Sequence, residues 1–283
     1  MKLAGFLALL ALLFGVATAV GGAIGPDREP AEREAPAHEP GTGGGDDVIE
    51  GHNPDTAHTD PDGGRAAGHT AGPVRGLAVS DGGLTLDLAR DELPRGDATM
   101  LRFTVRDAAG DAVRDFDVAH ARRMHLIVVR RDGRGFQHLH PRLVDGEWRV
   151  RMTIPQAGTY RAFADFERAG QAYTLATDVS VDGAANYRPL PRRSRVARVD
   201  GYRVERAPNE LRFTITRGGR EITPQPYLGA RGHLVALREG DLAFVHVHPT
   251  GDVYEAELER GTRYRLYLQF RHGGEVHTAE FTR

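Results

Sequence analysis

Short runs of alternating apolar and polar residues fill the chain after Arg75. Alternation puts residues i and i+2 on the same face of an extended chain, so it predicts β-strands with one buried face. The predicted strands cover residues 77–80, 84–89, 99–106, 147–154, 158–166, 173–181, 211–216 and 261–270. Turn residues separate these runs at spacings of about 8–12 residues, which is typical of a β-sandwich. No helical period of useful length occurs beyond the N-terminus.

One segment of this pattern occurs twice. Residues 124–141 read MHLIVVRRDGRGFQHLHP, and residues 232–249 read GHLVALREGDLAFVHVHP. Each copy has a His, an apolar run, a charged turn with Gly, an aromatic residue and then His-x-His-Pro. The apolar runs predict strands, and the pairs Asp132-Gly133 and Gly240-Asp241 suit two-residue turns, where positive φ favours Gly and Asp. We therefore predict a β-hairpin in each copy.

Turns centred on these two pairs set the register of the hairpins. The predicted opposite pairs are His125 with His140 and Ile127 with His138 in the first copy, and His233 with His248 and Val235 with His246 in the second. The three histidines of each copy then share one face, because side chains alternate along a strand. Opposed residues have Cβ atoms roughly 5 Å apart, so their imidazoles can reach one metal ion. We predict a three-His metal site in each copy; a one-residue slip of the register would break it.

The rest of the pattern also repeats in the same order. Residues 211–216 (LRFTIT) match 101–106 (LRFTVR), and GTRYRLYLQF at 261–270 matches GTYRAFADF at 158–166. A duplication explains the twin hairpins. We predict an all-β protein with two tandem Ig-like or cupredoxin-like β-sandwich domains, at residues 76–182 and 195–283. A Pro-containing linker at 183–194 joins them.

The N-terminal residues 1–26 are apolar, with no charge between Lys2 and Asp27. This length is close to the ~20 residues that span a bilayer, and Ala17-Thr18-Ala19 offers a signal-peptidase site. We expect a membrane anchor with the remaining chain outside the cytoplasm, or a secreted protein after cleavage. Residues 27–75 are rich in Gly, Pro and acidic residues, which predicts a disordered tether. Its sparse histidines, among them His38 and His58, could catch metal loosely.

Charge and cysteine content narrow the function classes. The net charge is −2, so the chain has no electrostatic signature of a nucleic-acid-binding protein. Cysteine is absent, which excludes disulfides, thiolate zinc sites, iron–sulfur clusters and the Cys ligand of blue copper.

Four further residues are secondary candidates because only one copy carries them. His120 lies five residues before His125, and its counterpart is near Leu228. Asp165, which aligns with Gln269, could be a fourth ligand or could orient a ligand. His272 and His277 flank Gly273-Gly274 in the last predicted hairpin, which has no His in the first copy.

The segments HLIVVRRDGRGFQHLHP, FADF, PYLGARGHLVALREGDLAFVHVHP and YRLYLQFRHGG carry a resemblance that covers nearly the whole chain after the tether. The chain resembles tandem β-domain proteins of high-GC bacteria that are secreted or membrane-anchored, loosely related to YtkA-like and CopC-like heavy-metal-associated domains. This resemblance implies a metal-handling role in the cell envelope, with a metal-transport or envelope protein as a possible partner. The N-terminal His that CopC-type proteins usually use has no positional match here.

Imidazole ligands suit Cu(II), Zn(II) and Ni(II), and Cu(II) binds most tightly in the usual order of affinities. We therefore expect an extracytoplasmic protein that binds and buffers Cu(II), or else Zn(II), without catalysing a reaction. One alternative is a structural or interaction module with Ig-like domains and structural histidines. A second is a zinc hydrolase, because His-x-His with a third His and one open position is also a hydrolytic pattern.

Overall fold

The structure is a computed structural model that describes residues 74–283, except residues 246, 251–252 and 257. The predicted anchor at 1–26 and all but the last two residues of the predicted tether lie outside the described residues. In the described part of the chain, no helix is long and apolar enough to cross a membrane. The elements there are strands, joined by turns and loops.

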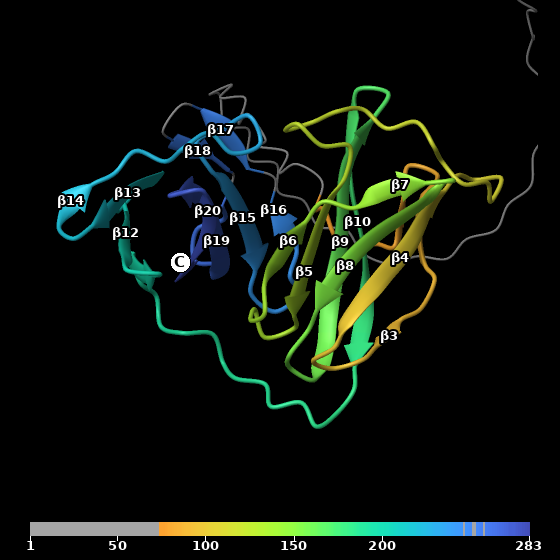
Figure 1. The fold of residues 1–283 in the computed structure, drawn as a ribbon, viewed down its shortest axis with the longest axis horizontal. Coiled ribbons are helices and arrows are strands. Elements are labelled where there is room, and N and C mark those ends of the chain that lie inside the picture. The colour runs from red at the N-terminus through yellow and green to blue at the C-terminus, as the bar shows by residue number, and fades with distance from the viewer. Residues whose placement is uncertain (1–73, 246, 251–252, 257) are drawn as a thin grey trace, which may run out of the picture. The chain divides into compact units, whose positions relative to one another are not determined.

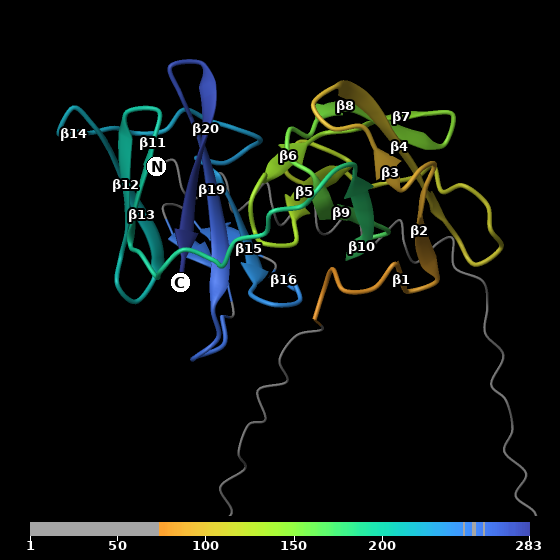
Figure 2. The ribbon, with the colours of Figure 1, turned by 90° about the horizontal axis from the view of Figure 1, so that it is seen from below.

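The first domain is made of two five-stranded sheets (Figures 1 and 2). One has the order β1-β2-β4-β8-β7 and the other β3-β10-β9-β5-β6. Their bounds are β1 Ser80–Asp81, β2 Leu84–Leu88, β3 Glu92–Leu93, β4 Ala98–Arg106, β5 His125–Arg130, β6 Gln137–Leu139, β7 Arg142–Val144, β8 Glu147–Thr153, β9 Gly158–Arg168 and β10 Gln171–Val181. A core of 22 buried residues, including Trp148 and Phe103, lies between the sheets.

The second domain repeats this plan. Its sheets have the orders β11-β12-β13-β18-β17, with β14 paired to β13, and β16-β15-β19-β20. The bounds are β11 Val196–Val199, β12 Tyr202–Arg206, β13 Leu211–Arg217, β14 Arg220–Glu221, β15 His233–Arg238, β16 Phe244–Val245, β17 His248–Thr250, β18 Val253–Glu255, β19 Tyr264–His272 and β20 Glu275–Thr282. The order β6-β5-β9-β10 matches β16-β15-β19-β20. The prediction of tandem all-β domains is confirmed.

Neither hairpin has the predicted two-residue turn, although the residues that pair between its strands do so in the register that the turn implied. In the first hairpin, Gly133 N donates to Arg130 O and Arg130 N donates to Arg134 O, so the loop holds residues 131–133. Ile127 nevertheless pairs with His138, because β6 gains one extra residue near Gly135, as in a β-bulge. In the second hairpin, Arg238 N donates to Ala243 O, so the loop spans residues 239–242. The predicted strand at 77–80 is also wrong, since β1 begins only at Ser80.

Strand β5 is buried along its whole length, and the reason lies in the contact between the domains. Leu126 and Val128 face the first core, whereas Ile127 and Val129 belong to a separate apolar cluster with Val235 and other residues of the second domain. In the same way β15 divides its side chains between the second core and this shared cluster. Both domains belong to the same compact unit. The two hairpins therefore meet through the faces opposite to their own cores.

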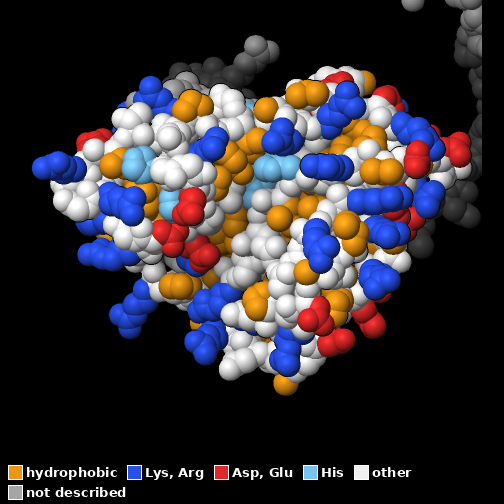
Figure 3. Space-filling model, viewed as in Figure 1, with side chains coloured by type: hydrophobic (Ala, Val, Ile, Leu, Met, Phe, Trp, Pro, Cys, Tyr) orange, Lys and Arg blue, Asp and Glu red, His pale blue; other side chains and the backbone are white. Residues whose placement is uncertain are grey.

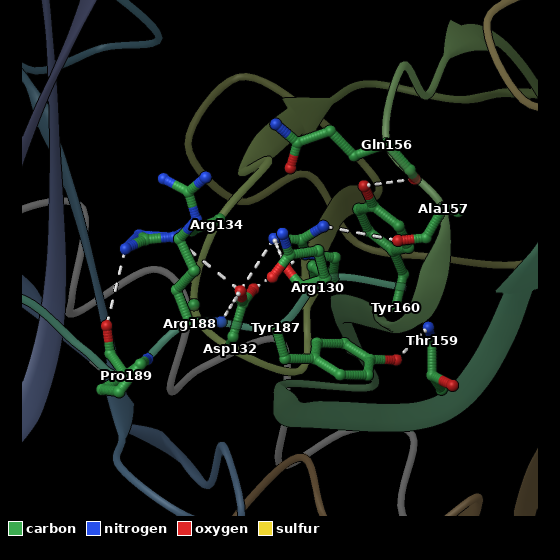
Figure 4. Close-up of polar contacts among 12 residues, drawn as sticks. Arg130, Asp132, Arg134, Gln156, Ala157, Thr159, Tyr160, Tyr187, Arg188 and Pro189 are labelled. Carbon is green, nitrogen blue, oxygen red and sulfur yellow. Dashed lines mark hydrogen bonds and ion pairs between the residues drawn. The ribbon is translucent and has the colours of Figure 1, made fainter. Parts of the chain in front are cut away.

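The connector between β10 and β11 has no regular secondary structure, but it is bonded to the first hairpin (Figure 4). Arg130 and Asp132 form a two-bond ion pair at 2.8 Å, with side chains only 5% and 6% exposed. Asp132 also accepts a hydrogen bond from Arg188 N of the connector, and Tyr187 OH accepts one from Thr159 N. Burial alone would raise the pKa of Asp132, but the hydrogen bonds from Arg130 and Arg188 keep it below its usual value.

Candidate metal centre

Three histidines of the first hairpin converge on the face that meets the second domain. His125 begins β5, His138 lies in β6 opposite Ile127, and His140 follows β6 directly. One ring nitrogen from each lies within 4.8 Å of the other two. The register that the sequence predicted for this copy is therefore confirmed where the strands pair, and it brings the three rings together.

The spacing of the three rings suits one metal ion. The ring centroids of His125 and His138 are 5.2 Å apart, those of His125 and His140 also 5.2 Å, and those of His138 and His140 4.9 Å. With metal–nitrogen bonds of about 2.0–2.1 Å, imidazoles around a tetrahedral Zn(II) have centroids roughly 5 Å apart. The rings thus already lie at about the separation that a shared ion requires.

Hydrogen bonds on the outer side of two rings determine where their protons are. His125 Nε2 lies 3.2 Å from Ala119 O, and His138 Nδ1 lies 2.7 Å from Gln269 Oε1. A carbonyl oxygen only accepts, so both of these nitrogens carry hydrogen. In neutral rings the inner nitrogens, His125 Nδ1 and His138 Nε2, then have only lone pairs. They face each other at 3.0 Å, and a cation between them would relieve the repulsion.

Burial keeps these rings neutral. It lowers the pKa of His125, and it lowers that of His138 well below the usual value, where the neighbouring His125 and His140 act in the same direction. Burial likewise lowers the pKa of His140 to about 4. Metal binding needs a deprotonated nitrogen. At neutral pH the cluster therefore presents lone pairs instead of positive charge.

The third ring leaves a buried nitrogen without a partner. His140 Nε2 has no hydrogen-bond partner among the described residues, although it is shielded from solvent. Buried polar atoms in folded proteins are nearly always bonded, so such an atom requires an explanation. A cavity of about 50 Å³ lies beside the cluster, and its lining includes His125, His138 and His233 but not His140. This is enough room for an ion and a water molecule.

The second copy differs from the prediction in how its last His is paired. His233 begins β15, as expected, but His248 pairs with Glu255 of β18 in the other sheet, and not with His233. The predicted opposition of His233 and His248 is therefore wrong. In the second domain the strand of the other sheet begins at His248 itself, whereas in the first domain it begins at Arg142, two residues after His140. His246 lies outside the described residues, so the Val235–His246 pair does too.

His233 lies against the cluster of the first domain. Its ring centroid is 6.1 Å from that of His138 and 6.4 Å from that of His125. Burial lowers the pKa of His233 to about 4. Its Nε2 lies 3.1 Å from Tyr227 O, which matches the bond from His125 to Ala119 O in the first copy. Histidine side chains are visible in the middle of the face shown in Figure 3.

The secondary candidates fall into two groups. His120 is exposed, and its ring centroid lies 5.6 Å from that of His233 and 6.1 Å from that of His125. It occupies a tight turn at φ 48°, and its predicted counterpart Leu228 takes φ 51° in the matching turn. Asp165 lines the same cavity, pairs across strands with His125 and accepts a hydrogen bond from Thr174.

His272 and His277 have different partners. Tyr202 OH is 2.7 Å from His272 Nδ1, and His277 Nδ1 is 2.8 Å from Asp200 Oδ2. His277 Nε2 also bonds to His272 O. These bonds join the β19–β20 hairpin to the β11–β12 turn. Because their ring nitrogens make these bonds, we assign His272 and His277 a structural role.

A family model matches both domains. The model described as "Domain of unknown function (DUF8832)" covers residues 78–183 and again residues 196–283. The chain belongs to the DUF8832 family. Each of the two DUF8832 segments contains one copy of the His hairpin. A search of curated proteins finds no significant match.

Solved structures give only distant matches. Salmonella alpha-2-macroglobulin reacted with methylamine is 15% identical over 74% of this chain and 15% of that chain, with a TM-score of 0.29. Trypsin-activated alpha-2-macroglobulin from Escherichia coli is 13% identical over 74% of this chain and 16% of that chain, with a TM-score of 0.29. This DUF8832 chain therefore spans less than a fifth of the length of either protein. Similarity at this level supports no conclusion about function.

Gln269 is the residue of the site that sequence reasoning missed. In the sequence Gln269 is only the counterpart of Asp165, and nothing in the pattern indicates that it reaches His138 of the other domain. One signal was present. Gln269 lies between Leu268 and Phe270 in the predicted strand at 261–270, and a buried amide there needs a partner.

Proposed function

We propose that this protein binds Cu(II) or Zn(II) through His125, His138 and His140 and buffers the ion outside the cytoplasmic membrane. The observation that carries the proposal is the convergence of three ring nitrogens, two of which are left unprotonated by the bonds on their outer side. Ligating histidines usually donate their second N–H to a carbonyl or carboxylate, which orients the ring. Ala119 and Gln269 provide such acceptors.

The choice of ion follows from the ligand set. Three neutral imidazoles suit Cu(II) and Zn(II), and Cu(II) binds a given nitrogen site more tightly. Cu(I) would prefer Met or Cys. Cysteine is absent, and Met124, next to the cluster in sequence, is fully buried in the core of the first domain. Cu(II) is therefore our first choice and Zn(II) our second.

The proposed location of the protein and its proposed role in binding metal are supported by the amino-acid sequence. The apolar residues 1–26 support a membrane anchor or a signal peptide, and the resemblance to YtkA-like and CopC-like domains supports metal handling in the envelope. We propose binding without turnover. A metal-transport or envelope protein that receives the ion is the partner we expect.

The alternative is an Ig-like interaction module with structural histidines. The bonds from His125 to Ala119 O and from His138 to Gln269 favour it, because structural histidines make such bonds too. The unpartnered His140 Nε2 favours the metal site instead. Metal uptake by the purified protein decides between the two.

The test is titration of the full chain, freed of metal by a chelator, with Cu(II) and separately with Zn(II). The double variant His138→Ala plus His140→Ala should lose the tightest ion, since only one ring of the three remains. The matched control is His272→Ala, which removes a histidine bonded to Tyr202 outside the cluster. We expect the control to bind as the wild type does. Equal uptake by the double variant and the wild type would rule the site out.

A further inference from the structure

We infer that the metal centre is built by both domains: Gln269 of the second domain holds His138 in place, and His233 supplies a fourth imidazole nitrogen. This inference rests on the proposed function. The metal site would then be formed by residues of both domains, and not by one hairpin alone.

Gln269 is placed to act as a positioning residue. It lies in β19, is 7% exposed, and its Oε1 accepts the hydrogen of His138 Nδ1 at 2.7 Å. Its own Nε2 donates to Thr278 Oγ1 at 3.3 Å, which orients the amide with its oxygen toward His138. The acceptor keeps the hydrogen on Nδ1, so the lone pair of His138 stays on Nε2, the nitrogen that faces His125. Loss of this acceptor would free His138 to rotate or to change tautomer.

His233 is placed to complete the set of ligands. Tyr227 O takes the hydrogen of its Nε2, so the lone pair lies on Nδ1. The ring centroid is 6.1 Å from that of His138, about 1 Å more than the separation expected in a tetrahedral site. His233 also pairs across strands with Gln269. Two adjacent side chains of the second domain thus approach the cluster of the first.

The packing of the domains keeps these groups close before any ion binds. The stacked rings of Phe136 and Tyr267, with centroids 4.0 Å apart, lie in the shared apolar layer. Tyr267 OH donates to Gly133 O of the first hairpin at 2.8 Å. A ligand that binds only the docked arrangement stabilises that arrangement by mass action. An ion held by both domains should therefore strengthen their contact.

The experiment measures Cu(II) and Zn(II) affinity of the full-length wild type and of the variants His233→Ala, Gln269→Ala and Gln269→Glu. We expect Gln269→Ala to weaken binding about 10–100-fold, as removal of a residue that orients a ligand usually does. Gln269→Glu keeps an acceptor oxygen and should restore binding. His233→Ala should weaken binding at least about tenfold and change the Cu(II) electron paramagnetic resonance signal, because one nitrogen ligand is lost.

Matched controls separate this effect from general damage. Gln225→Ala removes an amide that bonds Gly274 N in a loop of the same domain, and His272→Ala removes a histidine outside the cluster. Both should bind as the wild type does. Wild-type affinity and an unchanged signal in His233→Ala and Gln269→Ala would overturn the joint site, while loss of binding in His138→Ala would still support the proposed function. If the wild type binds no ion, the proposed function and this inference both fail.

Discussion

Acid should destabilise the metal-free protein through its buried histidines. The perturbation is a fall from about pH 7.5 to about pH 5, measured with a chelator present. Burial lowers the pKa of His140 and of His233 to about 4 in the folded protein, whereas an unfolded chain has a His pKa of about 6.5. At pH 5 the unfolded state therefore binds protons that the folded state does not. These two histidines therefore lower the stability as pH drops from about 6.5 to about 4, and their effect levels off below that.

The size of the effect follows from the two pKa values. At pH 5 each of these histidines should cost about 2 kcal/mol of unfolding free energy by proton linkage. Both rings are partly exposed, so solvent screening reduces this to about 1 kcal/mol each, or about 2 kcal/mol together. His125 and His138, whose pKa values burial also lowers, act in the same direction.

Urea denaturation at the two pH values measures the difference directly. Between about pH 7.5 and about pH 5, the double variant His140→Ala plus His233→Ala should lose about 2 kcal/mol less unfolding free energy than the wild type. Asp132 and Asp241, whose pKa values lie below the usual range, titrate at lower pH and add little here. An equal loss in the wild type and the double variant would show that these rings are not the source.

Three further predictions concern ligand and packing. Zn(II) at a hundred times its dissociation constant should raise the unfolding free energy by about 2.7 kcal/mol, and thermal melts with and without the ion will check this. Asp132→Ala strands the buried Arg130 and should cost about 3–5 kcal/mol in urea denaturation, while loss of less than about 1 kcal/mol would contradict the importance of that pair. Gly133→Ala should destabilise the hairpin by about 1 kcal/mol or more, because φ is 70° there and a Cβ would lie 2.9 Å from Leu190; an unchanged melting temperature would refute this reasoning.

The strands and the first His cluster were predictable because they depend on local rules. Alternation gave the long strands β4, β8, β9 and β10 to within a few residues, since a strand with one buried face must alternate. The pairing of Ile127 with His138 was also predictable, although the turn was not. The three-residue loop at 131–133 shifts the register by one residue, and the extra residue near Gly135 shifts it back. Nothing in the polar, Gly-rich sequence of the turn indicates these two shifts.

The amino-acid sequence by itself determined that the fold is all-β and duplicated, and that His125, His138 and His140 share one face of a hairpin. Only the tertiary structure decided what that face contacts. The runs of β5 and β15 are apolar on both sides, which is compatible with either a deeply buried strand or a contact between domains. The structure shows that the outer faces of the two hairpins pack on each other, so that Gln269 and His233 come to the cluster from more than 90 residues away in sequence. Contacts over such separations depend on how the two folded β-sandwich domains dock. The residue periodicity within either domain does not indicate how they dock.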